Sequence, residues 1–177
     1  MSPLRAAPTR YAVSLIAALT LVACSGDTAG GPVAPSRPSV SSSLAELPFH
    51  GNVEASQTAV YPAGTNTAIV HSTGAGTATH LGRFTLVSDL TLDLITLSGQ
   101  EQVTLTAANG DAIIATVAAQ GTPNPNGLTL STVESATITG GTGRFAGARG
   151  SYVLERVIVH ATGNSTGTFT GTIQLAK

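Results

Sequence analysis

Seven side chains in this sequence could take part in acid–base chemistry or hold a polar ligand: His71, His80, Glu101, Asp111, Tyr152, Glu155 and Arg156. Among them, His80, Glu101, Glu155 and Arg156 are our candidates for lining a pocket. Glu155 and Arg156 are adjacent, so on a β-strand they point to opposite faces and one charge must point inward. Burial raises the pKa of a carboxyl, which is what a general acid needs. The structural alternative is that Glu155 forms an ion pair with Arg144 or Arg149.

The sequence offers no motif for metal or nucleophilic chemistry. The histidines lack the paired spacing of a zinc site, and the only cysteine, Cys24, lies near the N-terminus. No Gly-x-Ser-x-Gly segment is present, which argues against a serine hydrolase. We therefore predict neither a bound metal nor a cofactor. Charged residues make up only 10% of the chain and form no basic cluster, so nucleic acid is excluded as a partner.

The segment Thr139–Gly150 holds five glycines in twelve residues and predicts a sharp corner between two strands. We expect Phe145 to plug one end of the core and Arg144 to bind loop carbonyls or a carboxylate. A nucleotide-binding glycine loop would need a helix to begin here, and the sequence that follows is β-type. The segment is therefore predicted to be structural, with these residues as its motif: Gly140, Gly141, Gly143, Arg144, Phe145 and Gly150.

The N-terminal residues have the features of a bacterial lipoprotein leader. Residues 1–23 combine two arginines with the short apolar run 11–23, which is too brief to span a membrane. The run ends in Leu-Val-Ala before Cys24, which resembles a lipobox, so Cys24 is the predicted lipid attachment site; the alternative is an ordinary signal peptide with a chance cysteine. Residues 24–43, rich in Gly, Pro and Ser, predict a disordered tether. The expected location is the bacterial cell envelope, on the outer membrane or the periplasmic face, or else the secreted fraction.

Residues 44–177 predict an all-β domain. Gly, Pro or Asn interrupts β-type sequence every ten to fifteen residues, as expected for consecutive antiparallel strands. Eight strands are predicted, at residues 47–56, 67–73, 77–97, 100–107, 112–120, 128–139, 151–161 and 167–175. Strands 86–94 and 167–175 alternate apolar with polar residues, whereas 113–117 and 152–159 are apolar on both faces. The second pattern indicates a covered outer wall, with a second subunit or the tether as the cover.

The segment Thr137–Phe145, followed by Ala148-Arg149-Gly150, resembles the Gly-Gly-Thr-Gly-Arg-Phe segment of the allene oxide cyclase and dirigent protein superfamily. The pieces Thr79–Gly82 and Ala108–Asp111 are similar to those of bacterial secreted members. The resemblance implies an eight-stranded antiparallel up-and-down β-barrel, commonly trimeric, that can hold a hydrophobic small molecule. The shared motif is scaffold, so it transfers no catalytic residue to this chain.

Two functions follow from these observations. The first is a lipid-anchored barrel that binds an apolar small molecule or serves a structural or assembly role. The alternative is a cofactor-free isomerase, cyclase or coupling guide like the plant enzymes. The scarcity of polar groups favours the first. A packed interior would support a structural role, and an acid and an arginine converging inside would support binding or catalysis.

Overall fold

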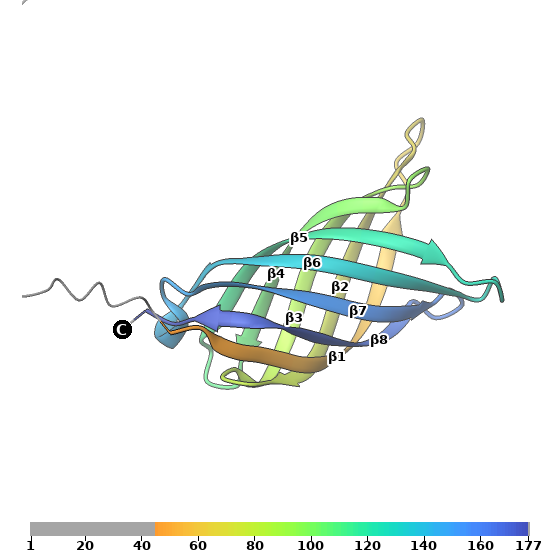
Figure 1. The fold of residues 1–177 in the computed structure, drawn as a ribbon. Coiled ribbons are helices and arrows are strands. Elements are labelled where there is room, and N and C mark those ends of the chain that lie inside the picture. Colours follow the sequence, from red (N-terminus) through yellow and green to blue (C-terminus); the bar gives the residue numbers. More distant parts are fainter. Residues whose placement is uncertain (1–44, 177) are drawn as a thin grey trace, which may run out of the picture. The chain divides into compact units, whose positions relative to one another are not determined.

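The computed structural model describes residues 45–176, which belong to one compact unit, and they form a closed β-barrel (Figure 1). Eight strands build it: β1 Leu47–Val60, β2 Thr67–Ala78, β3 Gly82–Asp93, β4 Ser98–Ala107, β5 Ala112–Pro123, β6 Thr129–Gly141, β7 Arg149–Val159 and β8 Asn164–Gln174. A 3-10 turn, η1, spans Gly143–Phe145. Within residues 45–176 this turn is the only helical element, so the all-β prediction is confirmed.

Each strand pairs antiparallel with the next, and β1 closes the barrel against β8. The closing ladder runs from Leu47 opposite Ile173 to Ser56 opposite Asn164. Every strand therefore has two hydrogen-bonded neighbours, and the sheet has no free edge. The predicted eight-stranded up-and-down barrel is confirmed.

Alternation of side chains decides which face of each strand lines the interior. In β3 the leucines Leu86 and Leu90 are buried, while Thr85 and Asp89, each directly before one of them, face outward. In β8, Phe169 and Ile173 are buried and the threonines between them are not. Since successive residues on a strand point to opposite faces, these patterns place the leucines and aromatics inside the barrel.

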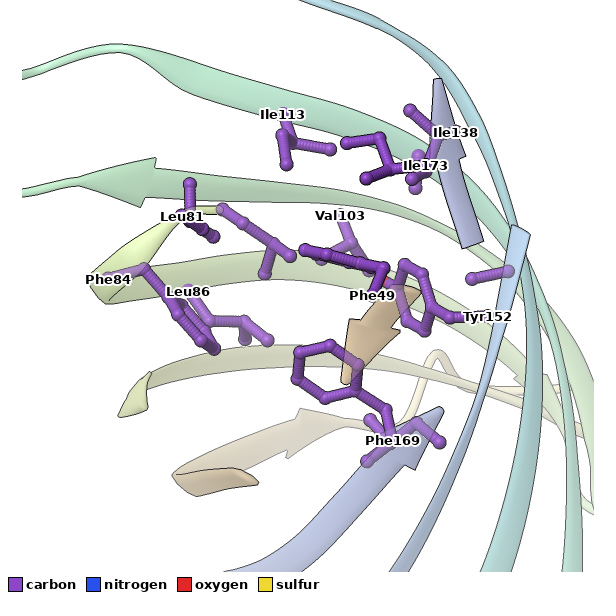
Figure 2. Close-up of a cluster of buried hydrophobic side chains, with 14 of the residues drawn as sticks. Phe49, Leu81, Phe84, Leu86, Val103, Ile113, Ile138, Tyr152, Phe169 and Ile173 are labelled. Atoms are coloured by element: carbon purple, nitrogen blue, oxygen red, sulfur yellow. The ribbon is translucent and has the colours of Figure 1, made fainter. Parts of the chain in front are cut away.

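The interior near the β6–β7 connection is filled by aromatic and branched side chains. Phe49, Phe84, Tyr152 and Phe169 form its centre (Figure 2). The ring centroids of Phe49 and Phe169 lie 5.1 Å apart, and those of Phe49 and Tyr152 lie 5.7 Å apart in an edge-to-face arrangement. A second, smaller hydrophobic cluster lines the other half of the barrel, with Ala68, Val70, Leu90 and Ala119.

Because the strands run up and down in order, the loops fall into two groups, one at each end of the barrel. We call one the clasp end; it carries residues 79–81, 108–111 and 142–148 together with the start of β1 and the end of β8. We call the other the rim end; it carries the loops 61–66, 94–97, 124–128 and 160–163. No helix among residues 45–176 is long and apolar enough to cross a membrane.

The predicted third strand, residues 77–97, is wrong in its boundaries. Thr77 and Ala78 belong to β2, and a turn at residues 79–81 separates them from β3. His80 has φ 62° and Gly82 has φ 76°, so the chain reverses through the left-handed region at both positions. The alternation predicted for residues 86–94 does not hold at Leu94, which lies in the loop after β3 and is exposed.

Candidate functional site

Polar side chains form a cluster inside the barrel, between the two hydrophobic clusters of the lining. Three of them are ionisable and come from neighbouring or nearby strands: Glu101 on β4, Glu134 on β6 and Arg156 on β7. Buried hydroxyls accompany them. We call this set the interior polar cluster; its members are Ser72, Ser88, Glu101, Thr132, Glu134, Arg156 and Ser165.

Arg156 and Glu134 form a buried ion pair. The Nε of Arg156 donates to Oε1 of Glu134 at 2.6 Å, and the two side chains are 5% and 4% exposed. The hydroxyl of Thr132 donates to the same carboxylate oxygen at 3.1 Å. On the other side, Nη1 of Arg156 reaches Oγ of Ser165 at 3.5 Å. These contacts hold the guanidinium in one orientation inside the barrel.

Glu101 also lies inside the barrel but has no comparable set of hydrogen bonds. Its Oε2 is buried and has no hydrogen-bond partner among the described residues. Burial, and secondly the negative charge of Glu134, raise the pKa of Glu101 to about 7, while Ser88 and Arg156 act in the opposite direction. The carboxyl of Glu101 is therefore partly protonated at neutral pH and can either donate or accept a hydrogen bond.

The phenol of Tyr152 borders the interior polar cluster from the aromatic side. Its pKa is raised, first by burial and then by the charges of Glu101 and Glu134. The group consequently stays neutral over the physiological range and keeps its proton as a hydrogen-bond donor. An acid, a fixed guanidinium and a phenol thus approach one region of the barrel.

Small side chains surround the interior polar cluster on the rim side. Ala55, Ala68 and Ala119 are all buried lining residues, in contrast to the large aromatics of the other half. Together with Val70, Leu90 and Ile158 they give this half an apolar wall of aliphatic side chains.

The structure separates the four pocket-lining candidates. Glu101 and Arg156 lie inside, in the interior polar cluster, whereas Glu155 faces outward on β7. His80 is exposed in the turn between β2 and β3. Cys24 lies outside the described residues. The ion pair that we considered for Glu155 with Arg144 or Arg149 is not present in residues 45–176.

Glu134 is the one ionisable member of the cluster that sequence reasoning missed. The signal was present in β6, where Glu134 is in phase with Ala136 and Ile138, both of which are buried. Residues two positions apart on a strand point to the same face, so Glu134 shares the inward face of Ala136 and Ile138. A search of the strand next to Arg156 for an inward-facing acid would have found Glu134.

The remaining motif residues form the clasp end. Nη2 of Arg144 donates to the carbonyl of Leu81 at 3.1 Å, and its Nε lies 3.9 Å from Oδ2 of Asp111. The guanidinium also stacks over the ring of Phe145, 4.8 Å from its centroid, and Phe145 itself is fully buried. Gly143 has φ 55°, and a Cβ there would overlap the Asp111 carboxylate. The segment therefore ties three loops together, and only the three-residue turn η1 is helical within it.

Hollows on the protein surface lie on the outer wall. One of about 790 Å³ covers the outer faces of β1 to β4, next to Asn52, Glu54 and Arg83. Another, of about 510 Å³, lies over β6 to β8 and includes Glu155 and Val157. Both are open and shallow, so neither encloses a ligand. No group of three or more His, Cys, Asp or Glu within residues 45–176 could hold a metal ion.

Two solved structures share this architecture. The structure of the pterocarpan synthase dirigent protein GePTS1 matches with a TM-score of 0.59 and 15% identity, over 81% of this chain and 100% of that chain. That of the pterocarpan synthase dirigent protein PsPTS1 matches with a TM-score of 0.58 and 15% identity, over 75% and 97%. No protein-family model matches the sequence. A search of curated proteins finds no match either. The predicted likeness to dirigent barrels is confirmed for the fold.

Proposed function

We propose that this chain is a lipid-anchored protein of the bacterial cell envelope whose dirigent-type barrel binds a small, largely apolar molecule with one polar group. The leader at residues 1–23 and the lipobox before Cys24 support the anchor. The observation that carries the binding role is Glu101, whose Oε2 is buried without a partner inside the barrel.

An unpartnered buried carboxyl is costly for the fold. Leaving such a group unsatisfied costs about 1–3 kcal/mol, and a native chain rarely keeps that cost without a use. A ligand hydroxyl or carbonyl would satisfy Oε2, since a carboxyl with a pKa of about 7 can donate or accept. Arg156, fixed by Glu134, would supply a positive charge to the same polar group.

The apolar part of the ligand would lie against the aliphatic wall on the rim side. Val70, Leu90 and Ala119 offer this surface, and they lie in the half of the barrel that the aromatic side chains leave to smaller ones. Burying apolar surface contributes about 25 cal/mol per Å², so this wall would supply affinity while Glu101 supplies orientation.

Ligand-observed NMR with a set of apolar carbonyl compounds and phenols tests the proposal. Compounds that bind the protein should lose affinity about tenfold in Glu101→Leu, which removes one hydrogen bond to a charged or polar carboxyl. The matched control is Glu155→Leu on the outer wall, which should bind as the unchanged protein does. Equal binding by Glu101→Leu would remove Glu101 from the site. Absence of any binding would leave the structural or assembly role.

A second candidate is a cofactor-free isomerase, cyclase or coupling guide. The structural neighbours are pterocarpan synthase dirigent proteins, and Glu101 has the pKa of about 7 that suits a general acid at neutral pH. For a substrate found in the NMR screen, Glu101→Gln should then retain binding and lose turnover. Unchanged turnover in that variant would exclude an acid–base role for Glu101.

A further inference from the structure

Large apolar side chains project into solvent from three of the four loops at the rim end. Tyr61 is 67% exposed, Ile95 is 73% exposed and Leu128 is 68% exposed. Val60 and Leu94, next to the first two, are exposed as well. Because the strands run up and down in order, these loops all lie at one end of the barrel, away from the C-terminal end of β8 (Figure 1). The β1–β2 and β3–β4 loops lie together, and the β5–β6 and β7–β8 loops form a second pair (Figure 1). We call the exposed side chains Tyr61, Ile95 and Leu128 the rim tips.

The rim loops carry no Asp, Glu, Lys or Arg. Residues 61–66, 94–97, 124–128 and 160–163 contain one titratable side chain besides Tyr61, which is His160. The clasp end differs sharply, since Asp111, Arg144 and Arg149 all lie in or beside its loops. The rim loops are therefore apolar and lack basic groups, and among the residues that flank them Asp93, at the end of β3, is the charged one.

Polar groups in the rim loops are occupied within the loops. The hydroxyl of Thr65 donates to the carbonyl of Pro62 at 2.9 Å. Oδ1 of Asp93 accepts from the backbone N–H groups of Ile95 and Thr96, each at 2.8 Å, and Oδ1 of Asn126 accepts from that of Leu128 at 2.9 Å. The peptide N–H groups of Ile95 and Leu128 thus need no water, which is the condition for a loop to enter a region of low water content.

The loops are also joined to one another. Leu94 N donates to the carbonyl of Asn66 at 2.8 Å and links the first two loops. His160 N donates to that of Leu128 at 3.0 Å and links the last two. These bonds fix the two loops of each pair relative to one another, so that docking would cost little conformational entropy within a pair.

The turn at residues 94–97 departs from ordinary turn chemistry. Its sequence is Leu-Ile-Thr-Leu, although turns favour Gly, Asn, Asp and Pro. Leu97 has φ 54°, in the left-handed region, where a residue with a Cβ is strained by roughly 1–2 kcal/mol. Ile95 is exposed in this turn, and local rules are broken in this way mostly at functional positions.

We propose that the rim end docks on a lipid bilayer, with Tyr61, Ile95 and Leu128 inserted at the interface. A neutral bilayer suits a rim without basic residues, because attraction to anionic lipid needs Lys or Arg. Tyrosine is favoured at such interfaces, where its ring is apolar and its hydroxyl stays hydrated. Docking does not depend on the lipid anchor.

The anchor of the proposed function is compatible with this orientation. Between Cys24 and Ala45 lie 44 − 24 = 20 residues, whose reach is at most about 70 Å at ~3.4 Å per residue. A barrel strand such as β2, with 12 residues, is only about 40 Å long at ~3.3 Å per residue. A chain attached to the membrane at Cys24 could therefore turn its rim end to the same membrane.

Flotation with vesicles of pure phosphatidylcholine tests the docking separately from the anchor. The fragment 41–177 lacks Cys24 and contains all eight strands and the whole barrel lining, so it includes the complete closed sheet. It should float with the vesicles. Ile95→Ser should weaken binding about fivefold or more, and the triple variant Tyr61→Ser, Ile95→Ser, Leu128→Ser should abolish it. Val87→Ser, at a wall position that is 45% exposed, is the matched control and should bind unchanged.

Tryptophan fluorescence can detect docking without a variant that binds vesicles less tightly. The chain contains no tryptophan, so Tyr61→Trp introduces a single probe. Its emission should shift to the blue with vesicles and be quenched by lipids brominated in the acyl chain, while Val87→Trp should show neither effect. Failure of the fragment to float, or an equal response at both positions, would overturn the proposal. Self-association without vesicles that the triple variant abolishes would instead assign the rim tips to a protein interface.

Discussion

Arg156 Nε and Glu134 Oε1 lie 2.6 Å apart inside the barrel, and the two side chains are only 5% and 4% exposed. The pair links β6 to β7 across the interior surface, where the sequence offers few other polar groups. Glu101 shares this environment without an equivalent partner for its Oε2. The contrast between a satisfied pair and an unsatisfied acid is the central electrostatic feature of the barrel.

Removing one member of this pair should destabilise the protein more than removing both. Glu134→Leu leaves the Arg156 guanidinium buried without its partner, at a cost of about 3–5 kcal/mol. The double variant Glu134→Leu, Arg156→Met should be near neutral because no uncompensated charge remains. Chemical unfolding of the three proteins gives the comparison. Equal destabilisation by the single and double variants would contradict the account.

Glu101 should make stability fall as the pH rises from about 4.5 to about 7. Its pKa in the folded protein is about 7, above the ordinary 4.5, so the folded state holds the proton longer than the unfolded state does. The contribution is fully present below pH 4.5 and is lost as the pH passes through 7, by up to about 3 kcal/mol. Glu101→Leu should therefore stabilise the protein more at pH 8 than at pH 5. Thermal unfolding at the two pH values measures the difference, and a constant difference would refute it.

The clasp should weaken when its arginine is removed. Arg144→Ala loses the hydrogen bond to the Leu81 carbonyl, the nearby charge of Asp111 and the stacking on Phe145. We expect a loss of about 1–2 kcal/mol, since the side chain is half exposed and its ion pair is screened. Arg83→Ala is the matched control, because Arg83 is exposed on β3. A thermal midpoint that falls equally in both variants would argue against a clasp.

The lipid anchor can be tested at Cys24. Mass spectrometry of the mature protein should find an N-terminal cysteine carrying acyl chains, and Cys24→Ser combined with the triple rim variant should move the protein from the membrane fraction to the soluble fraction. An unmodified cysteine at the mature N-terminus would end the lipoprotein proposal. The rim tips could still hold Cys24→Ser protein weakly on membranes, so the two sets of changes are combined.

The outer wall of β6 and β7 should mediate self-association. Val133, Val153 and Val157 are each more than two-fifths exposed on this wall, and for residues 152–159 of β7 the sequence predicts an apolar outer face. Apolar strands of this kind are commonly covered by another copy. Light scattering should show an oligomer, and a trimer is what the dirigent resemblance implies. Val153→Lys with Val157→Lys should yield the monomer, while Val87→Lys should not. If the unchanged protein is a monomer, the prediction that this wall mediates self-association is wrong.

Strand number and the direction of most side chains could be predicted from the sequence, because alternation on β3 and β8 reports directly on burial. The turn at His80 could not. It uses a histidine with positive φ, followed by a buried Leu81 whose carbonyl Arg144 holds from another loop. Local sequence gives no sign of a contact between residues 63 positions apart, so the strands on either side merged into one prediction.

Only part of the candidate site could be predicted from the sequence in the same way. Adjacent Glu155 and Arg156 had to face opposite ways, but β7 is apolar on both faces, and alternation alone does not say which is inside. The structure decides it through Tyr152 and Leu154, which are buried on the side of Arg156. Pairing between strands then brings Glu134 to that arginine, and this depends on register rather than on sequence order.

Closure of β1 against β8 also governs how the chain can fold. Leu47 meets Ile173, so the last ladder cannot form until nearly the whole domain has left the ribosome. Contacts between such distant residues slow folding, since a long loop must close before they contribute. During synthesis the barrel therefore cannot close early, which is compatible with the export that we propose from residues 1–23.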